Sequence, residues 1–211
     1  MIQCVLSRRR EGERVDDALR GYREECAAFF AQAFAQTPRT LVFGEGPTDA
    51  RLMMIGEAPG EYETLAGRPF VGKAGKHLDA FLALAGLTRE ALYITNTVKV
   101  RPTKVSAKGR LSNRPPSRVE IALFAPWLAQ EIALVHPAAI ATLGNIALCA
   151  LAGRSLRIGD VHGDWMTLPG LPAPLFPLYH PASLLYNPGL TEVYARDVRA
   201  LGRALGTLAD S

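Results

Sequence analysis

Short apolar runs alternate along this chain with segments of helical periodicity, and this alternation limits the possible fold more than any other feature. Strands are expected at four runs: RLMMIG (51–56), ALYITNTV (91–98), AAIATLG (138–144) and PLFPLYH (174–180). Helices are expected at 15–35, 75–86, about 117–135, 145–153 and along a C-terminal stripe of Tyr194, Val198, Leu201 and Leu205. This order predicts an α/β fold with a mostly parallel sheet covered on both faces.

Two further segments carry weaker signals. The run DWMTLPG (164–170) is expected to add a short strand, and residues 101–117 are too rich in Pro, Ser and Lys for a regular element. A loop of that length inside a compact domain is usually functional or disordered. Without an internal repeat or a linker, the 211 residues, 48% of them hydrophobic, are expected to form one domain with the N-terminal helix packed on it.

Composition argues against membrane and secreted classes. No apolar run approaches the roughly 20 residues of a membrane span, and the first residues lack the apolar core of a signal peptide. Cys4, Cys26 and Cys149 are widely spaced and odd in number, which favours reduced thiols over a disulfide framework. The sequence therefore predicts a cytoplasmic protein with no membrane association.

Positive charge is concentrated in one segment. Outside it, 17 basic residues remain against 20 acidic ones, although the whole chain has a net charge of +4. The segment fits either a solvated loop or a contact to a phosphate backbone. Its seven basic residues are Lys99, Arg101, Lys104, Lys108, Arg110, Arg114 and Arg118, with no acidic residue among them.

Three polar segments stand at the carboxyl ends of expected strands: GEAPGEYE (56–63), TNTVK (95–99) and YHPASLL (179–185). Each alone has a structural explanation as a turn or a strand end. Parallel sheets bind ligands outside the carboxyl ends of their strands. Together the three segments therefore predict one pocket at one edge of the sheet.

The longer segments GEAPGEYETLAGRPFVGKAG (56–75), ITNTVKVRP (94–102) and YHPASLLYNP (179–188) resemble motifs of the uracil-DNA glycosylase superfamily, most closely its family 4. The resemblance runs from about residue 40 to residue 205 and includes LVFGEG (41–46). It implies a three-layer α/β/α sandwich around a four-stranded, mainly parallel sheet. It also implies a monomeric DNA-repair enzyme that flips uracil from single- or double-stranded DNA and hydrolyses its N-glycosidic bond, leaving an abasic site.

One departure from family 4 concerns its iron–sulfur cluster, which four cysteines hold. The matching positions here fall near Phe29 and Gln32 and at Val100 and Phe124, and none is a cysteine. The expectation is a protein with no metal and no cofactor, in which apolar side chains such as Phe29 and Phe124 fill that space.

The resemblance assigns the catalytic roles. His180 matches the residue that stabilises the departing uracil anion by donating an N–H to its O2. Relatives of family 1 carry an aspartate where this chain has Ala58, so Glu57 is the first candidate to activate water. Glu63 matches a position near the base, where it could help to exclude the thymine methyl group. The roles of Glu57 and Glu63 could be exchanged.

Base recognition falls to two further residues. Phe70 matches a stacking aromatic, although a Phe after Pro could equally belong to the core. Asn96 matches an amide that accepts from uracil N3–H and donates to O4, a pattern that cytosine reverses. The expected substrate-binding set is Ala58, Glu63, Phe70 and Asn96.

Contact with DNA is expected from several segments. Leu184 stands where the superfamily inserts an apolar wedge, yet it or Leu185 could be an ordinary core residue. Tyr186 replaces an arginine that is frequent in family 4, and Lys73 opens a helix whose N-terminus suits a phosphate. The expected DNA-binding set is Lys73, Lys99, Arg101, Lys104, Lys108, Arg110, Ser183 and Leu184.

Two alternatives to an active glycosylase stay open within the superfamily. One relative bonds covalently to the abasic sugar through a loop histidine, but residues 99–118 contain no histidine. The other alternative is a DNA-binding module that has lost catalysis. The preferred damaged base (uracil, hypoxanthine or another deaminated base) also stays open.

Overall fold

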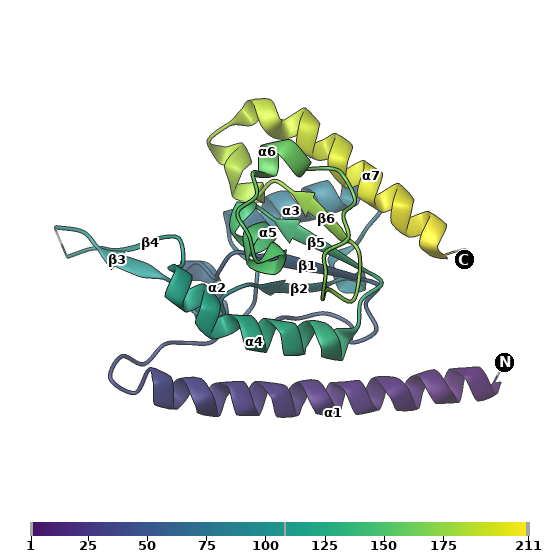
Figure 1. Cartoon of the computed structure of the whole chain (residues 1–211), viewed down its shortest axis with the longest axis horizontal. Coiled ribbons are helices and arrows are strands. Elements are labelled where there is room, and N and C mark those ends of the chain that lie inside the picture. Colours follow the sequence, from purple (N-terminus) through teal and green to yellow (C-terminus); the bar gives the residue numbers. More distant parts are fainter. Residues whose placement is uncertain (1, 108, 210–211) are drawn as a thin grey trace.

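Four parallel strands lie at the centre of the molecule (Figure 1). The computed structural model describes the backbone of residues 2–107 and 109–209. The strand order is β2–β1–β5–β6, with β1 Leu52–Gly56, β2 Tyr93–Asn96, β5 Ala139–Leu143 and β6 Leu175–Leu178. The pairing of β1 with β2 and β5, and of β5 with β6, is parallel throughout, which confirms the predicted sheet.

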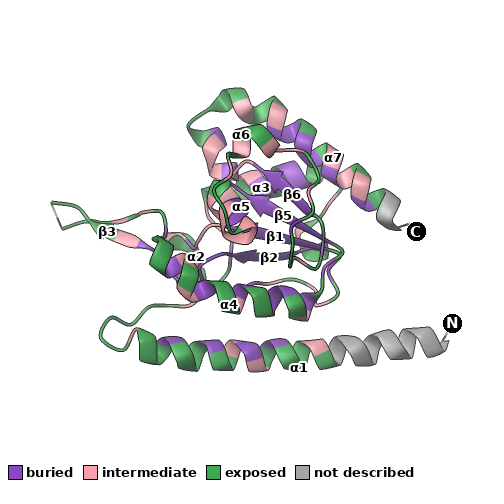
Figure 2. Cartoon of the chain, in the orientation of Figure 1, coloured by how far each residue is buried: buried purple, intermediate pink, exposed green. Residues whose placement is uncertain are grey.

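Successive residues of each strand point to opposite faces, and both faces are covered. Leu52 and Met54 of β1 belong to one apolar core, whereas Met53 and Ile55 belong to the other. All five residues of β1 are buried, as a sheet between two helical layers requires. The expected three-layer α/β/α sandwich is therefore confirmed (Figure 2).

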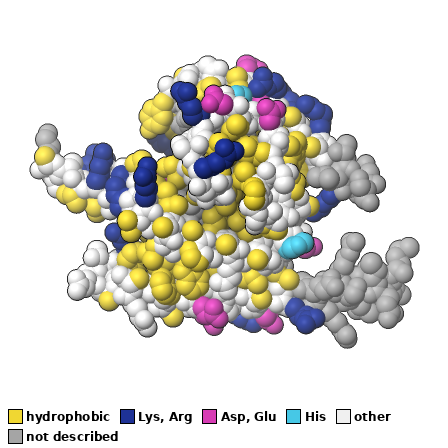
Figure 3. All heavy atoms as spheres, viewed as in Figure 1, with side chains coloured by type: hydrophobic (Ala, Val, Ile, Leu, Met, Phe, Trp, Pro, Cys, Tyr) yellow, Lys and Arg dark blue, Asp and Glu magenta, His cyan; other side chains and the backbone are white. Residues whose placement is uncertain are grey.

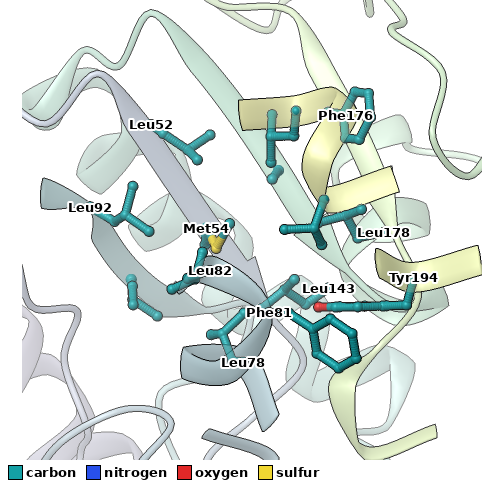
Figure 4. Packing of buried hydrophobic residues seen from close by; sticks show 14 of the residues in the cluster. Leu52, Met54, Leu78, Phe81, Leu82, Leu92, Leu143, Phe176, Leu178 and Tyr194 are labelled. Carbon is teal, nitrogen blue, oxygen red and sulfur yellow. The ribbon is translucent and has the colours of Figure 1, made fainter. Parts of the chain in front are cut away.

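Helices α3 (Lys73–Leu84) and α7 (Thr191–Ala209) cover the first face. Figure 4 shows Leu78, Phe81 and Leu82 of α3 beside Tyr194 of α7 and the strand residues beneath them. The predicted apolar stripe of α7 is buried along its length: Tyr194, Val198, Leu201 and Leu205. This face therefore packs as its helical periodicity predicts.

Helices α1 (Ile2–Ala33), α4 (Arg118–Val135) and α5 (Asn145–Ala152) cover the second face. The helix expected at 15–35 is part of the longer α1, which buries residues spaced three or four apart: Leu19, Tyr22, Cys26 and Phe30. Ser117 caps α4 by accepting from the backbone N–H of Glu120, which confirms the expected start of this helix. In Figure 1, α1 runs along α4.

The structure corrects two expectations about irregular segments. Residues 101–117 do not form a plain loop, because β3 (Thr103–Val105) and β4 (Leu111–Asn113) pair as an antiparallel hairpin that projects from the body (Figure 1). The segment DWMTLPG forms only a single bridge, between Met166 and Leu175, so the expected strand is absent there. Short helices complete the described chain: α2 (Glu61–Ala66), α6 (Ile158–Val161), and the 3-10 helices η1 (Arg89–Ala91), η2 (Pro181–Leu185) and η3 (Pro188–Leu190). Within the described ranges no helix is both long and apolar enough to cross a lipid bilayer.

Candidate active site

A cavity of about 330 Å³ opens at the carboxyl ends of the strands. The chain leaves β1 for β2 on one side and later crosses to β5 on the other side of β1, so the strand order reverses direction here. Such a switch point leaves a crevice in an open parallel sheet. The walls come from the loop after β1, the end of β2, the start of α3, the hairpin and η2. The sequence-predicted pocket therefore exists.

Glu63 holds the glycine-rich loop in shape. Its Oε2 accepts from the backbone N–H of Gly60 at 3.1 Å, and its Oε1 accepts from the N–H of Gly72 at 2.7 Å. A Cβ on Gly60 would lie 2.7 Å from that Oε2, so a side chain there would displace the carboxylate. Both carboxylate oxygens of Glu63 are thus engaged by the two ends of the loop, although the residue lines the cavity.

Phe70 stands in the cavity wall with an unusual backbone. Its φ of 54° lies in the left-handed region, which non-glycine residues adopt mainly where the surroundings enforce it. The guanidinium of Arg89 donates to the Phe70 carbonyl at 3.0 Å, and a Cβ on Gly75 would lie 1.7 Å from that oxygen. The ring is buried and lies 5.9 Å from the imidazole of His180, between ring centroids. The structure therefore fixes a flat aromatic face beside the histidine.

Asn96 ends β2 and is 2% exposed. Its Oδ1 is buried and, within the described part of the chain, has no hydrogen-bond partner. A Cβ on Gly56 would lie 2.5 Å from this oxygen, so the glycine permits its position. Buried polar atoms are nearly always paired in folded proteins. An orphaned acceptor in a cavity wall therefore indicates a donor on a ligand.

His180 lies across the cavity, directly after β6. Its Nδ1 accepts from the backbone N–H of Ala182 at 3.1 Å, so the proton of the neutral ring is carried by Nε2. Burial lowers the pKa of His180 to about 4, although the nearby Glu63 carboxylate opposes this shift. The ring is therefore neutral at pH 7 and can donate one N–H.

Glu57 follows β1 but is not among the residues that line the cavity. Burial raises the pKa of its carboxyl group, and no described residue donates a hydrogen bond to that group. Its backbone carbonyl accepts from the N–H of Val98 at 3.1 Å, which ties the loop after β1 to the end of β2. Ala58, the next residue, lines the cavity as expected.

The expectation that Lys99 contacts DNA is wrong. Its side chain is 0% exposed, and its Nζ lies 2.5 Å from Oε2 of Glu131 on α4. A charge sealed beneath α1 and α4 cannot reach a phosphate backbone. The run of basic residues gave no sign of this burial, because Lys99 meets its partner only through the tertiary fold.

Leu184 is also placed differently from the expectation. It is 6% exposed and packs in the core formed with α3 and α7, so it cannot act as a wedge. Leu185 is 43% exposed and lines the cavity, and Tyr186 is 88% exposed beside it. Ser183 donates its hydroxyl to the carbonyl of His180 at 2.6 Å, which shapes the turn.

The other basic residues expected to bind DNA lie in different surroundings. Lys73 is exposed at the cavity, and Lys104 and Arg110 are exposed on the hairpin, where Figure 3 shows basic side chains gathered. Lys108 lies outside the described residues. Arg101 is engaged within the protein, because it donates to Asn113 at 2.7 Å and to Glu61 at 2.9 Å.

Asn113 lines the cavity from the hairpin, and sequence reasoning did not identify it. Its Oδ1 accepts from Arg101, so its amide NH₂ group is directed elsewhere. The only signal was its place at the end of the basic segment, which carried no indication that a hairpin would return it to the cavity.

The family model of the "Uracil DNA glycosylase superfamily" matches residues 43–201. The chain belongs to the uracil-DNA glycosylase superfamily. A "Type-4 uracil-DNA glycosylase" of Saccharolobus solfataricus is 39% identical over 176 residues, covering 80% of this chain and 78% of that protein. A "Type-4 uracil-DNA glycosylase" of Pyrobaculum aerophilum is 39% identical over 166 residues, covering 76% and 81%.

A solved structure supports the fold of this superfamily member. The crystal structure of Pedobacter heparinus SMUG2 matches with a TM-score of 0.52 and covers 77% of each chain. Its sequence identity is 14%, so this likeness bears on the fold alone.

The iron–sulfur cluster that the resemblance to family 4 implies does not fit the residues of this superfamily member. Val100 and Phe124 are buried in an apolar cluster with Cys26, Val98 and Phe30. The rings of Phe30 and Phe124 stack 4.2 Å apart between centroids, with 11° between their planes. Phe29 is exposed, so Phe30 takes the buried place expected for it. Cys26 is the one thiol there, and the described residues contain no group of three or more His, Cys, Asp or Glu arranged to hold a metal.

Proposed function

We propose that this protein is a uracil-DNA glycosylase that starts base-excision repair by hydrolysing the N-glycosidic bond of a flipped uracil nucleotide. The buried, unpartnered Oδ1 of Asn96 carries the proposal, because it requires a ligand that donates a hydrogen bond in this cavity. Uracil N3–H is such a donor. The type-4 relatives, 39% identical over most of the chain, support the same activity.

Recognition of the base uses Asn96 and Phe70. The Asn96 amide accepts from N3–H through Oδ1 and donates to O4 through its NH₂ group. Cytosine presents an acceptor at N3 and a donor at N4, so the same amide orientation opposes it. Phe70, held by its left-handed backbone and the bond from Arg89, stacks on the pyrimidine ring.

Bond cleavage uses His180 as an uncharged donor. As the N-glycosidic bond breaks, the base leaves with its bonding electrons as an anion, and the Nε2–H of His180 donates to O2. The bond from the Ala182 N–H to Nδ1 fixes this tautomer in advance. A donor that is already oriented toward developing charge costs no reorganisation during the reaction.

Water activation falls to Glu57 in this proposal. Glu63 is the weaker candidate because both its oxygens accept backbone N–H groups. Glu57 is half-buried with no described side-chain partner, and burial raises the pKa of its carboxyl group, which suits a general base. Glu57 removes a proton from water as the oxygen attacks the sugar C1′, which leaves an abasic site.

Contact with DNA involves the rim of the cavity and the hairpin. Leu185 is the apolar side chain available to enter the space left by the flipped base, with Tyr186 beside it. Lys73, Lys104 and Arg110 are exposed and contact phosphates. We propose action as a cytoplasmic monomer on single- and double-stranded DNA.

Incubation with an oligonucleotide containing one uracil tests the proposal. Alkaline cleavage and a gel that also resolves covalent adducts should show strand scission without an adduct. His180→Ala should lower the single-turnover rate by about 10²–10³, the usual cost of removing one oriented donor. The control is His136→Asn, at the exposed left-handed end of α4, where Asn is tolerated. Wild-type turnover by His180→Ala, or uracil DNA left intact by the wild type, would overturn it.

A further inference from the structure

A buried ion pair lies behind the residue that reads the base. The side chains of Lys99 and Glu131 are both 0% exposed, and Nζ lies 2.5 Å from Oε2. The same ammonium donates to Oγ1 of Thr95 at 2.6 Å and to the backbone carbonyl of Asn96 at 2.7 Å. Each of its three N–H groups therefore has an acceptor.

Glu131 connects this ammonium to the inner surface of β2. Its Oε1 accepts from the hydroxyl of Tyr93 at 3.0 Å, and its Oε2 accepts from the hydroxyl of Thr95 at 3.0 Å. Tyr93 and Thr95 share one face of the strand, and Asn96 points from the other. The charged network thus holds β2 from the side opposite the cavity.

A second set of bonds fixes the next residue. The backbone N–H and the hydroxyl of Thr97 both donate to the carbonyl of Gly56, each at 2.8 Å. The backbone carbonyl of Asn96 is therefore bonded to Lys99, and the next residue, Thr97, is bonded to β1. Its side-chain amide has no such bond through Oδ1 within the described residues. The bonds around Asn96 described here therefore act on its side chain through the backbone.

Helix α1 closes the network from water. Tyr22 of α1 packs in the same apolar cluster as Tyr93, and Cys26 packs with Val98 and Val100 on either side of Lys99. A Cβ on Gly44 would lie 2.6 Å from Oε1 of Glu131, so the chain approaches the carboxylate closely there. Removing two charges from water is costly, and apolar replacements of such pairs are frequently as stable. Stability alone therefore does not account for this pair.

We propose that the Lys99–Glu131 pair is a positioning device for Asn96: it fixes the backbone so that the amide presents its acceptor to uracil N3–H. Neither side chain touches the base, and both act through the Asn96 carbonyl and the Thr95 hydroxyl. The inference rests on the proposed function, and it assigns a role in base recognition to residues outside the cavity wall.

The double variant Lys99→Met/Glu131→Gln tests the role, because it removes both charges and nearly preserves side-chain volume. We expect an unfolding midpoint near that of the wild type. The single-turnover rate on uracil DNA should fall about 10- to 100-fold. A loss of this size is expected when a side chain that holds the substrate is displaced by about 1 Å. Inhibition by free uracil should weaken as well, while affinity for abasic-site DNA should stay unchanged. Leu201→Ala, in the α3–α7 core, is the control that loses stability but keeps its rate.

A cycle with Asn96→Ala separates positioning from general damage. If the pair acts through Asn96, adding the double variant to Asn96→Ala lowers the rate no further. Equal losses in both backgrounds, or a wild-type rate in the double variant, would overturn the inference. If the double variant does not fold, Thr95→Val removes the bridging hydroxyl alone. It should lower the single-turnover rate and weaken inhibition by free uracil, both to a smaller extent than the double variant. If the wild-type protein is inactive on uracil DNA, the proposed function is wrong. The inference is then still tested by comparing the binding of free uracil to the wild type and to the double variant.

Discussion

At the scale of single residues, the proposed selectivity depends on the orientation of one amide. Asn96 carries an acceptor and a donor on the same side chain, so a rotation by half a turn would exchange its preference from uracil to cytosine. An added Cβ on Gly56 would lie 2.5 Å from Oδ1 of Asn96 and 2.4 Å from the ring of Phe70. Position 56 must therefore stay glycine for Asn96 and Phe70 to keep these places.

Asn96→Asp should therefore alter the choice of base. The change replaces the amide donor by a second acceptor oxygen, which cannot satisfy uracil O4 but can accept from cytosine N4–H₂. A buried polar group left unpaired costs about 1–3 kcal/mol, and more when it is charged. Uracil excision should fall sharply, and weak cytosine excision should be greatest in single strands or mismatches, where flipping is least costly. The measurement is the ratio of the two excision rates, and an unchanged ratio would make Asn96 a structural residue only.

Glu57→Gln should separate catalysis from stability. The single-turnover rate should fall by about 10²–10⁴, the usual contribution of a general base. Because burial raises the pKa of Glu57, its charge opposes folding above its ordinary pKa, so the neutral amide should slightly raise the free energy of unfolding at pH 7. The acid limb of the wild-type rate profile should also titrate above the ordinary glutamate value, as single-turnover kinetics across pH would show.

Glu63→Gln is the matched comparison. Its amide keeps one acceptor oxygen for two backbone donors, at Gly60 and Gly72, so thermal unfolding should shift to lower temperature. If this variant loses the base function and Glu57→Gln retains it, the two roles are exchanged.

The sequence motifs predicted the residues that line the cavity more accurately than the residues around it. Phe70, Asn96 and His180 come from three separate motifs, and the structure brings them into one cavity. Lys99 and Leu184 were misplaced because burial depends on partners far away in the chain. A lysine in a basic run and a leucine in a pair look the same whether buried or exposed.

At the scale of elements, Arg114 joins the base of the hairpin to α4. Arg114 donates to the carbonyl of Thr103 at 3.0 Å and to both oxygens of Glu120, at 2.6 and 2.8 Å. The Arg114 guanidinium holds the pKa of Glu120 down at about 2. Since the folded-state pKa is lowered, the stabilisation is complete above the ordinary glutamate value and is lost only as pH falls toward 2. The hairpin base therefore stays intact across the neutral range.

Lys104→Ala/Arg110→Ala should weaken DNA binding without changing sequence preference. Each lost phosphate contact should flatten the plot of log affinity against log salt by roughly 0.7–0.9 units. The control is Arg154→Ala/Arg199→Ala, two exposed arginines outside the hairpin. Fluorescence anisotropy across a salt series measures the slope, and an equal slope in both variants would show that the hairpin charges are merely solvated.

The hairpin also shows why short peripheral strands are harder to predict from sequence than the strands of the central sheet. The strands of the sheet have continuous apolar runs, whereas β3 and β4 have three residues each and expose most of their side chains. Their pairing depends on side-chain bonds from Arg114 to Thr103 and to α4, which no local propensity indicates.

At the scale of the whole molecule, aromatic packing joins α1 to α4 where the resemblance to family 4 places a cluster. Phe30 stacks on Phe124, and Trp127 lies against Phe30 with 5.9 Å between ring centroids. The purified protein should therefore be colourless, and a chelator should leave its unfolding midpoint unchanged. Phe124→Ala should lower the free energy of unfolding by about 3–5 kcal/mol. Stoichiometric iron with visible absorbance that bleaches on reduction would contradict this account.

The position of His180 after the last strand of the sheet has a consequence for synthesis on the ribosome. Phe70 and Asn96, the residues proposed to read the base, emerge early, whereas β6 and His180 emerge only after β5 and its helix. A nascent chain that ends before β6 leaves the edge of β5 unpaired and lacks His180. Translation therefore adds His180, the proposed donor to the departing base, only when the sheet can be completed, and we expect an unfinished chain to be unable to release uracil.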